Sequence, residues 1–128
     1  VAAAIPNGKL VLADIQPEML KKARARMEKK NQTNTDYYTC QGARFDFPDN
    51  TFDRIFLITV MGEVEEKELY LKEFFRMLKP TGLLSVSEQA GDPDKLSIAQ
   101  TTQLATQAGF AVNKLYGGER NYTLNFIK

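Results

Sequence analysis

The sequence predicts an α/β domain with a mostly parallel β-sheet flanked by helices. Short apolar runs of strand length alternate along the chain with longer segments of helical periodicity. Chains that alternate in this way form parallel sheets covered by helices. The last two apolar runs are separated only by residues 117–120. This separation is too short for a crossover between parallel strands, so we expect a C-terminal antiparallel hairpin.

The first predicted strand and helix can be located from individual residues. Residues 9–14 form a short apolar strand. Pro17 then suits the first turn of a helix, because its fixed φ fits the helix and its missing N–H is not needed there. Apolar residues at i, i+4 and i+8 from Met19 predict an amphipathic helix over residues 17–30. Residues 1–5 have the pattern of a helix end, broken by the Pro-Asn-Gly that follows.

The remainder of the chain continues the alternation. A loop with a Pro-Asp-Asn turn signal covers residues 45–50, and Gly109 is expected to follow the last helix as its C′ residue. A turn at residues 79–82 is expected to stop the preceding helix. The predicted strands are 36–40, 53–59, 82–87, 110–116 and 121–127, and the predicted helices are 65–78 and 94–108.

Composition narrows the function classes. The 128 residues fit one domain, residues 1–128, and a net charge of +1 argues against nucleic-acid binding. No apolar run approaches the roughly 20 residues needed to span a membrane, and no signal peptide is predicted. Since there is one cysteine, Cys40, and no histidine, we expect no internal disulfide, no metal site and no Ser-His or Cys-His catalysis. A reducing cytoplasm is the simplest location for such a chain.

Polar residues follow the predicted strands, where open α/β sheets bind their ligands. They are Asp14 after the first strand, then Gln41 and Gly42, then Thr59 to Glu63, and finally Ser87 to Gln89. A carboxylate at the position of Asp14 can accept hydrogen bonds from both ribose hydroxyls of a nucleotide. Alternatively, it is a solvated acid that suits the start of the next helix. Position alone favours neither interpretation.

Four motifs in order resemble those of class I S-adenosylmethionine-dependent methyltransferases. They are LADIQPEML, FPDNTFDRIFL, LYLKEFFRMLKPTGLLSVSE and LATQAGF, the last followed by the hairpin. The sequence is most similar to the ubiquinone and menaquinone C-methyltransferase type, over nearly the whole chain. The resemblance implies a Rossmann-like fold, S-adenosylmethionine as cofactor and a small-molecule methyl acceptor. Methyl transfer proceeds by aligning the two partners and excluding water, which this composition permits.

The resemblance also implies site residues. Asp14 matches the acid that binds the adenosine ribose, and Ile15 and Met19 match positions that pack on adenine, although plain core packing is favoured for Met19. Gln41 stands where the family has an aspartate facing the adenine amine, with Gly42 next to it. A glutamine oxygen could accept the same hydrogen bond.

The segment after the third predicted strand is expected to face the methyl group and the acceptor. It includes Thr59, Val60 and Met61. Glu63 and Tyr70 could also touch the substrate, although a solvated or packed role is favoured for both. No catalytic residue is predicted.

One family feature is not matched in this sequence. The first strand of the family and its glycine-rich loop have no counterpart, so we expect an N-terminally incomplete methyltransferase-like domain. In the family that strand is central, between the strands found here at 9–14 and 53–59, whose edges would be left unpaired. Two other functions stay open: a non-catalytic binding or dimerisation module, and an NAD-binding Rossmann half-domain that uses Asp14. The expected partners are a small-molecule substrate and a second copy in a homodimer.

Overall fold

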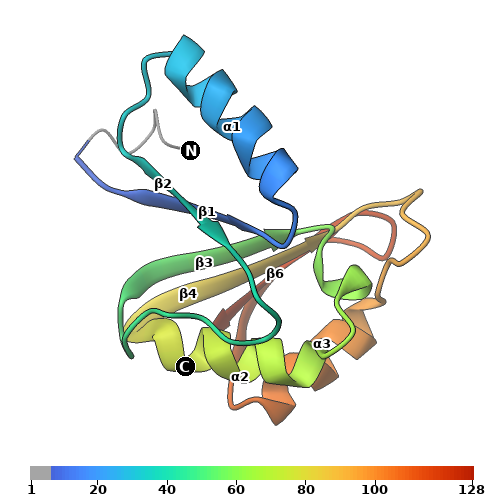
Figure 1. Cartoon of the computed structure of the whole chain (residues 1–128). Coiled ribbons are helices and arrows are strands. Elements are labelled where there is room, and N and C mark those ends of the chain that lie inside the picture. The colour runs from blue at the N-terminus through green and yellow to red at the C-terminus, as the bar shows by residue number, and fades with distance from the viewer. Residues whose placement is uncertain (1–6) are drawn as a thin grey trace. The chain divides into compact units, whose positions relative to one another are not determined.

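The computed structural model describes residues 7–128 and confirms the α/β class (Figure 1). The helix end predicted over residues 1–5 lies outside the described residues. The chain divides into two compact units, Val1–Phe45 and Asp46–Lys128. None of the helices among residues 7–128 combines the length and the apolar composition needed to cross a bilayer.

The first unit is a single βαβ motif. Strand β1 (Leu10–Asp14) leads into helix α1 (Pro17–Lys29), and the chain returns as β2 (Thr35–Thr39). The two strands pair in parallel, so that Asp14 lies beside Thr39 at their carboxyl ends. Helix α1 has Pro17 in its first turn, as predicted, and buries Leu20.

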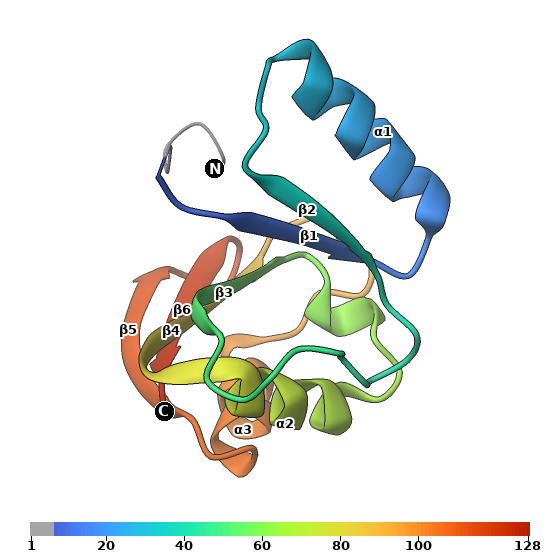
Figure 2. The ribbon, with the colours of Figure 1, turned by 60° about the vertical axis from the view of Figure 1, so that its left-hand side comes forward.

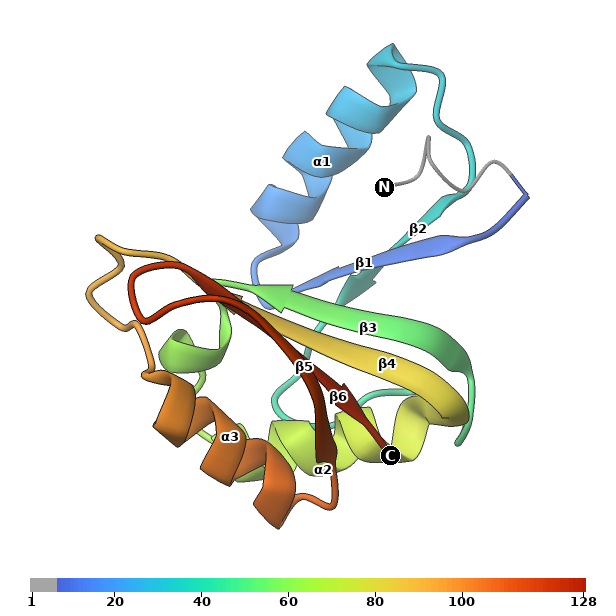
Figure 3. The same ribbon diagram turned by 180° about the vertical axis from the view of Figure 1, so that it is seen from behind.

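The second unit contains a four-stranded sheet in the order β3-β4-β6-β5 (Figure 3). The strands are β3 (Phe52–Ile58), β4 (Leu78–Glu88), β5 (Ala111–Gly117) and β6 (Tyr122–Ile127). Strands β3 and β4 pair in parallel, whereas β6 is antiparallel to both β4 and β5. Only β6 therefore runs against the other three strands of this sheet, and the predicted C-terminal hairpin is confirmed.

Two helices cover one face of this sheet. Helix α2 (Lys67–Met77) and helix α3 (Ile98–Gln107) lie side by side below the strands in Figures 1 and 2. A short 3₁₀ helix, η2 (Met61–Glu63), precedes α2 and was not predicted. Alternate residues of β4 and β6 point into the core, which is the arrangement expected for a strand buried on one face. The buried apolar residues of this unit include Leu71, Phe74, Met77, Leu84, Val86, Ala105, Phe110, Leu124 and Phe126.

The predicted turn at residues 79–82 is wrong. Helix α2 ends at Met77, and β4 begins at the next residue. The pairing with β3 shifts between Leu78 and Leu83, so the Lys-Pro-Thr-Gly segment forms an irregularity within an extended strand. Gly82 is required there, because a Cβ atom at this position would lie 2.6 Å from Cδ1 of Leu78.

Helix α3 begins four residues later than predicted. Ser97 is its N-cap: the side chain accepts from the Gln100 amide, and the Gln100 side chain accepts from the Ser97 amide. This capping box satisfies two backbone donors at the helix start, and it leaves Asp94 in the preceding loop. Gly109 follows the helix with φ = +110°, which confirms its predicted place.

Strands β1 and β3 belong to different sheets among the described residues. Each has a hydrogen-bonded strand on one side only, β2 and β4 respectively. These are the two strands that the family resemblance places on either side of a central strand. The separate pairing of β1 and β3 is compatible with the expectation that the central strand of the family has no counterpart in this sequence.

Candidate functional site

Asp14 lies at the carboxyl end of β1 and is oriented by the backbone. Its Oδ1 accepts a hydrogen bond of 2.9 Å from the amide of Gln16. Its carbonyl oxygen accepts from the amide of Cys40 at 2.8 Å, which ties the end of β1 to the residue that follows β2. No ion pair to the Asp14 carboxylate is found among residues 7–128. A half-buried carboxylate held in this way can accept hydrogen bonds from a diol.

Two apolar side chains that follow Asp14 in the chain are open to solvent. Ile15 is 63% exposed and Met19 is 47% exposed. The favoured interpretation of Met19 as a core residue is therefore wrong: the turn that positions α1 directs Leu20, rather than Met19, into the unit. Exposed apolar side chains in the segment that follows an oriented carboxylate fit a ligand that has an apolar ring and a polar sugar.

Gln41 and Gly42 follow β2 and are both exposed. Because β1 and β2 pair in parallel, this segment starts at the edge of the sheet where Asp14 lies. Gly42 has φ = +72°, a conformation that glycine adopts at little cost. The five predicted residues of this unit, Asp14, Ile15, Met19, Gln41 and Gly42, thus come from segments at or directly after the carboxyl ends of β1 and β2.

Cys40 belongs to the same edge and was not predicted as a site residue. Its thiol is half-buried, and burial raises its pKa, with a smaller contribution from the negative charge of Asp14. A thiol of this kind stays protonated at neutral pH and is a weak nucleophile. In the sequence, the only signal for a site role of Cys40 was its position at the end of the predicted strand.

Thr59 follows β3 in the second unit and has a rare backbone conformation. Its φ is +54°, in the left-handed region that β-branched residues seldom occupy. The Thr59 amide donates to the Ser87 carbonyl at 2.9 Å, and its hydroxyl donates to the Ile58 carbonyl at 2.7 Å. These bonds hold the chain as it leaves the sheet, and such conformations concentrate at functional sites.

Three of the four other residues expected near the methyl group or the substrate differ in burial. Met61 is 1% exposed, so its side chain is part of the core and offers no surface to a ligand. Val60 is 40% exposed. Tyr70 lies on α2 with its ring 6.2 Å from that of Phe74, which is a packed position.

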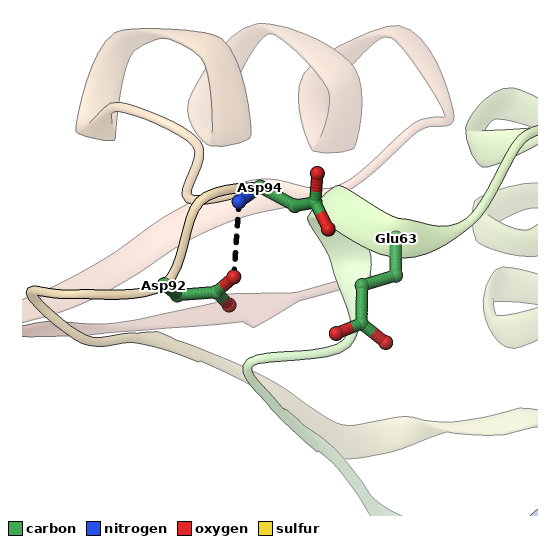
Figure 4. Close-up of side chains that lie close together, drawn as sticks. All are labelled: Glu63, Asp92 and Asp94. Carbon is green, nitrogen blue, oxygen red and sulfur yellow. Dashed lines mark hydrogen bonds between the residues drawn. The ribbon is translucent and has the colours of Figure 1, made fainter.

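Glu63 lies in an acidic cluster that the sequence did not predict. Its carboxylate and those of Asp92 and Asp94 place one oxygen each within 4.8 Å of one another (Figure 4). Asp92 also accepts a hydrogen bond from the Asp94 amide at 3.0 Å. Glu63 comes from η2, whereas the two aspartates come from the loop between β4 and α3.

Glu88 was named only as one of the polar residues after the fourth predicted strand, and its burial was not predicted. It ends β4, is 1% exposed, and neither carboxylate oxygen has a hydrogen-bond partner. Burial raises its pKa, and the charges of Asp92 and Glu63 raise it further; Lys95 and the nearby Leu96 amide offset part of this shift. Alternation along β4 could have indicated that this residue points inward with Leu84 and Val86.

Comparison with known proteins identifies the class. Residues 1–82 match the family model described as "Methyltransferase domain", and the chain belongs to this family. The resemblance seen in the sequence is thereby confirmed.

Individual relatives indicate a narrower type of methyltransferase than the family model does. The chain is 42% identical over 83 residues to the ubiquinone/menaquinone biosynthesis C-methyltransferase UbiE of Salmonella arizonae. The match covers 64% of this chain and 33% of that protein, so it spans about a third of the curated relative.

Solved structures share the fold. A SAM-dependent methyltransferase from Aquifex aeolicus superimposes with a TM-score of 0.87 at 23% identity, covering 94% of this chain and 69% of that one. The trans-methyltransferase CalH, solved with SAH, gives a TM-score of 0.78 at 17% identity, covering 94% of this chain and 43% of that one. The Rossmann-like fold is thus confirmed, and S-adenosylmethionine, the predicted cofactor, is the cofactor of this class of methyltransferase.

Proposed function

We propose that this chain supplies the adenosine-binding part of an S-adenosylmethionine-dependent methyltransferase that acts on a small-molecule acceptor. The observation that carries the proposal is the Asp14 carboxylate at the end of β1. It is oriented by the Gln16 amide, and the exposed side chains of Ile15 and Met19 follow it in the chain.

The residues of the first unit fit the groups of the cofactor. Asp14 would accept hydrogen bonds from the two ribose hydroxyls, a role for which an ionised carboxylate has spare acceptor capacity. Ile15 and Met19 would pack against the adenine ring, and removing their surface from water would stabilise the complex. Gln41 would accept a hydrogen bond from the adenine amine.

The second unit would contribute the segment that faces the reacting groups. The bonds from Thr59 to Ser87 and Ile58 hold the end of β3 in one conformation, which limits motion at the point where a methyl acceptor would approach. When bound, S-adenosylmethionine supplies an activated methyl group on a sulfonium. The chain's part is to bind and orient the cofactor and to exclude water.

The Salmonella relative at 42% identity is a C-methyltransferase of ubiquinone and menaquinone biosynthesis. This similarity supports a small organic acceptor over a macromolecule. A cytoplasmic location and a homodimer stay predictions.

Calorimetric titration with S-adenosylhomocysteine tests the proposal. We expect the wild-type chain to bind and Asp14→Ala to lose binding. Asp36→Asn is the control, because Asp36 forms an exposed ion pair with Lys9 and contributes little to stability. Binding of NAD in place of S-adenosylhomocysteine would favour the dinucleotide alternative. Binding of neither ligand would favour the non-catalytic module.

A further inference from the structure

The charged side chains of this chain are distributed unevenly between its two units. Residues 1–45 contain eight basic and four acidic residues, whereas residues 46–128 contain nine basic and twelve acidic residues. The net charge of +1 therefore hides a positive excess in the first unit and a negative excess in the second. Because exposed charges are screened beyond about 10 Å at 0.1 M salt, the first unit can attract an anion although the whole chain is nearly neutral.

Most of the positive charge of the first unit lies on helix α1. Six of the eight basic residues fall within residues 21–30, on the helix or directly after it, and all six are exposed. The same helix has two acids, Glu18 and Glu28. Clusters of about four to eight Lys and Arg on an amphipathic helix are typical of segments that bind anionic lipid surfaces. The six basic residues are Lys21, Lys22, Arg24, Arg26, Lys29 and Lys30.

The apolar side of α1 is already packed within its own unit. The helix contacts both β1 and β2 and lies along them in Figure 2. Leu20 is buried, and Ala23 and Met27, which follow it at i+3 and i+7, are half-buried. The side of the helix that lies opposite Leu20 is therefore the side available to a partner.

Four of the basic residues form one stripe on the exposed part of the helix, which we call the basic stripe: Lys22, Arg26, Lys29 and Lys30. Lys22, Arg26 and Lys29 are separated by four and three residues, and Lys30 lies four residues after Arg26. Residues at these spacings are neighbours on a helix surface, where like charges repel. Within residues 7–128, none of the four forms an ion pair. The basic stripe therefore carries an electrostatic cost that an anionic partner would remove.

The needs of the helix itself account for only part of the stripe. Arg26 and Lys29 lie in the last turn, where the helix dipole favours a positive charge. Lys22 lies in the second turn and has no such benefit, because the dipole acts within the end turns. Glu18, four residues before Lys22, pairs instead with Lys21 at 3.3 Å. Lys22 and the continuous stripe thus point to a partner outside the helix.

The composition of α1 distinguishes between the two large anions that such a stripe could meet. Proteins read nucleic-acid bases with amide and hydroxyl side chains and with bidentate arginine, and α1 has no amide or hydroxyl side chain. One of its two arginines, Arg24, lies over the ring of Tyr37, with 4.7 Å between the guanidinium carbon and the ring centre. An anionic bilayer needs only positive charge on an open face, which flexible lysine side chains supply. These features favour a lipid surface.

We propose that the basic stripe of α1 docks the chain on an anionic lipid surface. The contact is electrostatic and lies outside the bilayer, because the apolar side of α1 is packed on its own unit. It requires no membrane-spanning helix, and none is found among residues 7–128. The proposal does not rest on the proposed function, since no residue of the basic stripe is assigned to adenosine.

The test is co-sedimentation of the whole chain, without cofactor, with vesicles of equal amounts of phosphatidylglycerol and phosphatidylcholine. We expect binding at low ionic strength, no binding to vesicles of phosphatidylcholine alone, and release at about 1 M salt, where the screening length falls to about 3 Å. The double variant Lys22→Glu and Arg26→Glu should bind at least tenfold more weakly, because each basic residue near the surface contributes a factor of about five. Since glutamate favours helices about as well as lysine and arginine do, its circular dichroism spectrum should match that of the wild type.

A second variant, Lys29→Gln with Lys30→Gln, keeps the test independent of the first pair. It should bind at least several-fold more weakly than the wild type. The matched control is the double variant Lys72→Glu and Arg120→Glu, which changes the net charge as the first variant does, at two exposed positions of the second unit. The control should bind the anionic vesicles as the wild type does.

The proposal is overturned if the wild type does not bind the anionic vesicles. It is also overturned if the control loses as much affinity as the variants of α1, because attraction would then follow the total charge. Tighter binding of duplex DNA than of anionic vesicles, lost in the variants of α1, would assign the basic stripe to a nucleic acid and would overturn the proposal as well.

Discussion

Gly62 packs so tightly on Asp94 that a methyl group on its Cα would overlap the Asp94 carbonyl oxygen. Gly62→Ala must therefore displace either η2 or the loop after β4. We expect a loss of about 1–3 kcal/mol in the free energy of unfolding, typical of an overpacked position. Urea denaturation followed by circular dichroism measures it. Gly118→Ala is the control, since the space that its Cβ would occupy has no other atom within 4 Å. Equal stability of the two variants would contradict the close packing.

Substitution of Ile15 tests whether its side chain binds the cofactor or packs within the protein. Because its side chain is 63% exposed, Ile15→Ser should leave the melting temperature of the free chain unchanged. Affinity for S-adenosylhomocysteine should fall about tenfold, because full burial of such a side chain contributes about 1.5–3 kcal/mol. Leu69→Ser on α2, where the side chain is 48% exposed, is the matched control and should bind normally. A lower melting temperature for Ile15→Ser without a change in affinity would point to a packing role.

Tyr122 and Thr101 form a buried polar pair in the second unit. Their hydroxyl groups lie 2.7 Å apart, and the Tyr122 hydroxyl donates to the Leu96 carbonyl at 2.8 Å. Tyr122→Phe should cost about 1–3 kcal/mol, because it leaves the buried Thr101 hydroxyl without this partner. In a double-mutant cycle with Thr101→Val, we expect a coupling energy of about 0.5–3 kcal/mol from thermal unfolding. Tyr116→Phe, at an exposed site, should change stability little, and strictly additive effects would argue against the pair.

The raised pKa of Glu88 predicts how the stability of the folded state changes with pH. Burial, and then the charges of Asp92 and Glu63, raise its pKa in the folded state above the ordinary value of 4.5, despite the opposing effect of Lys95. Above pH 4.5 the folded state thus holds a proton that the unfolded state has lost. Stability therefore decreases as the pH rises from 4.5 through the folded-state pKa.

Glu88→Gln should remove this decrease and melt at a higher temperature than the wild type at neutral pH. The measurement is a series of thermal melts from acidic to mildly alkaline pH at constant ionic strength. A variant that is less stable than the wild type at neutral pH would show that the ionised carboxylate is favourable in the folded state.

The sequence predicted the elements of the fold better than the direction of single side chains. Periodicity located α1, and the short separation of the last two strands located the terminal hairpin, since both depend on local pattern. It did not distinguish Met19, 47% exposed, from Met61, 1% exposed, because burial depends on which face of a short turn meets the rest of the unit. The error at residues 79–82 has a similar cause. Pro and Gly normally signal a turn, but here the strand absorbs them as an irregularity in its pairing with β3.

The residues of the candidate site also differ in how far the sequence could predict them. The position of Asp14 at a strand end next to a helix could be predicted, whereas its role toward ribose came from the family resemblance and stays a prediction. Glu88 was named only as a polar residue after a strand, because its burial and the acids near it, in η2 and in the following loop, result from tertiary packing. Charge clusters of this kind arise from tertiary contacts, which no single segment of sequence records.

Cys40 follows β2, and its amide is bonded to the carbonyl oxygen of Asp14. As the chain has one cysteine, a thiol-directed fluorophore would attach at a single position without any mutation, at a pH high enough to ionise the half-buried thiol. The dye would stand at the edge of the sheet where adenosine is proposed to bind. Its emission would therefore report occupancy directly, and the unmodified chain already has the layout of an optical sensor for S-adenosylmethionine and its product.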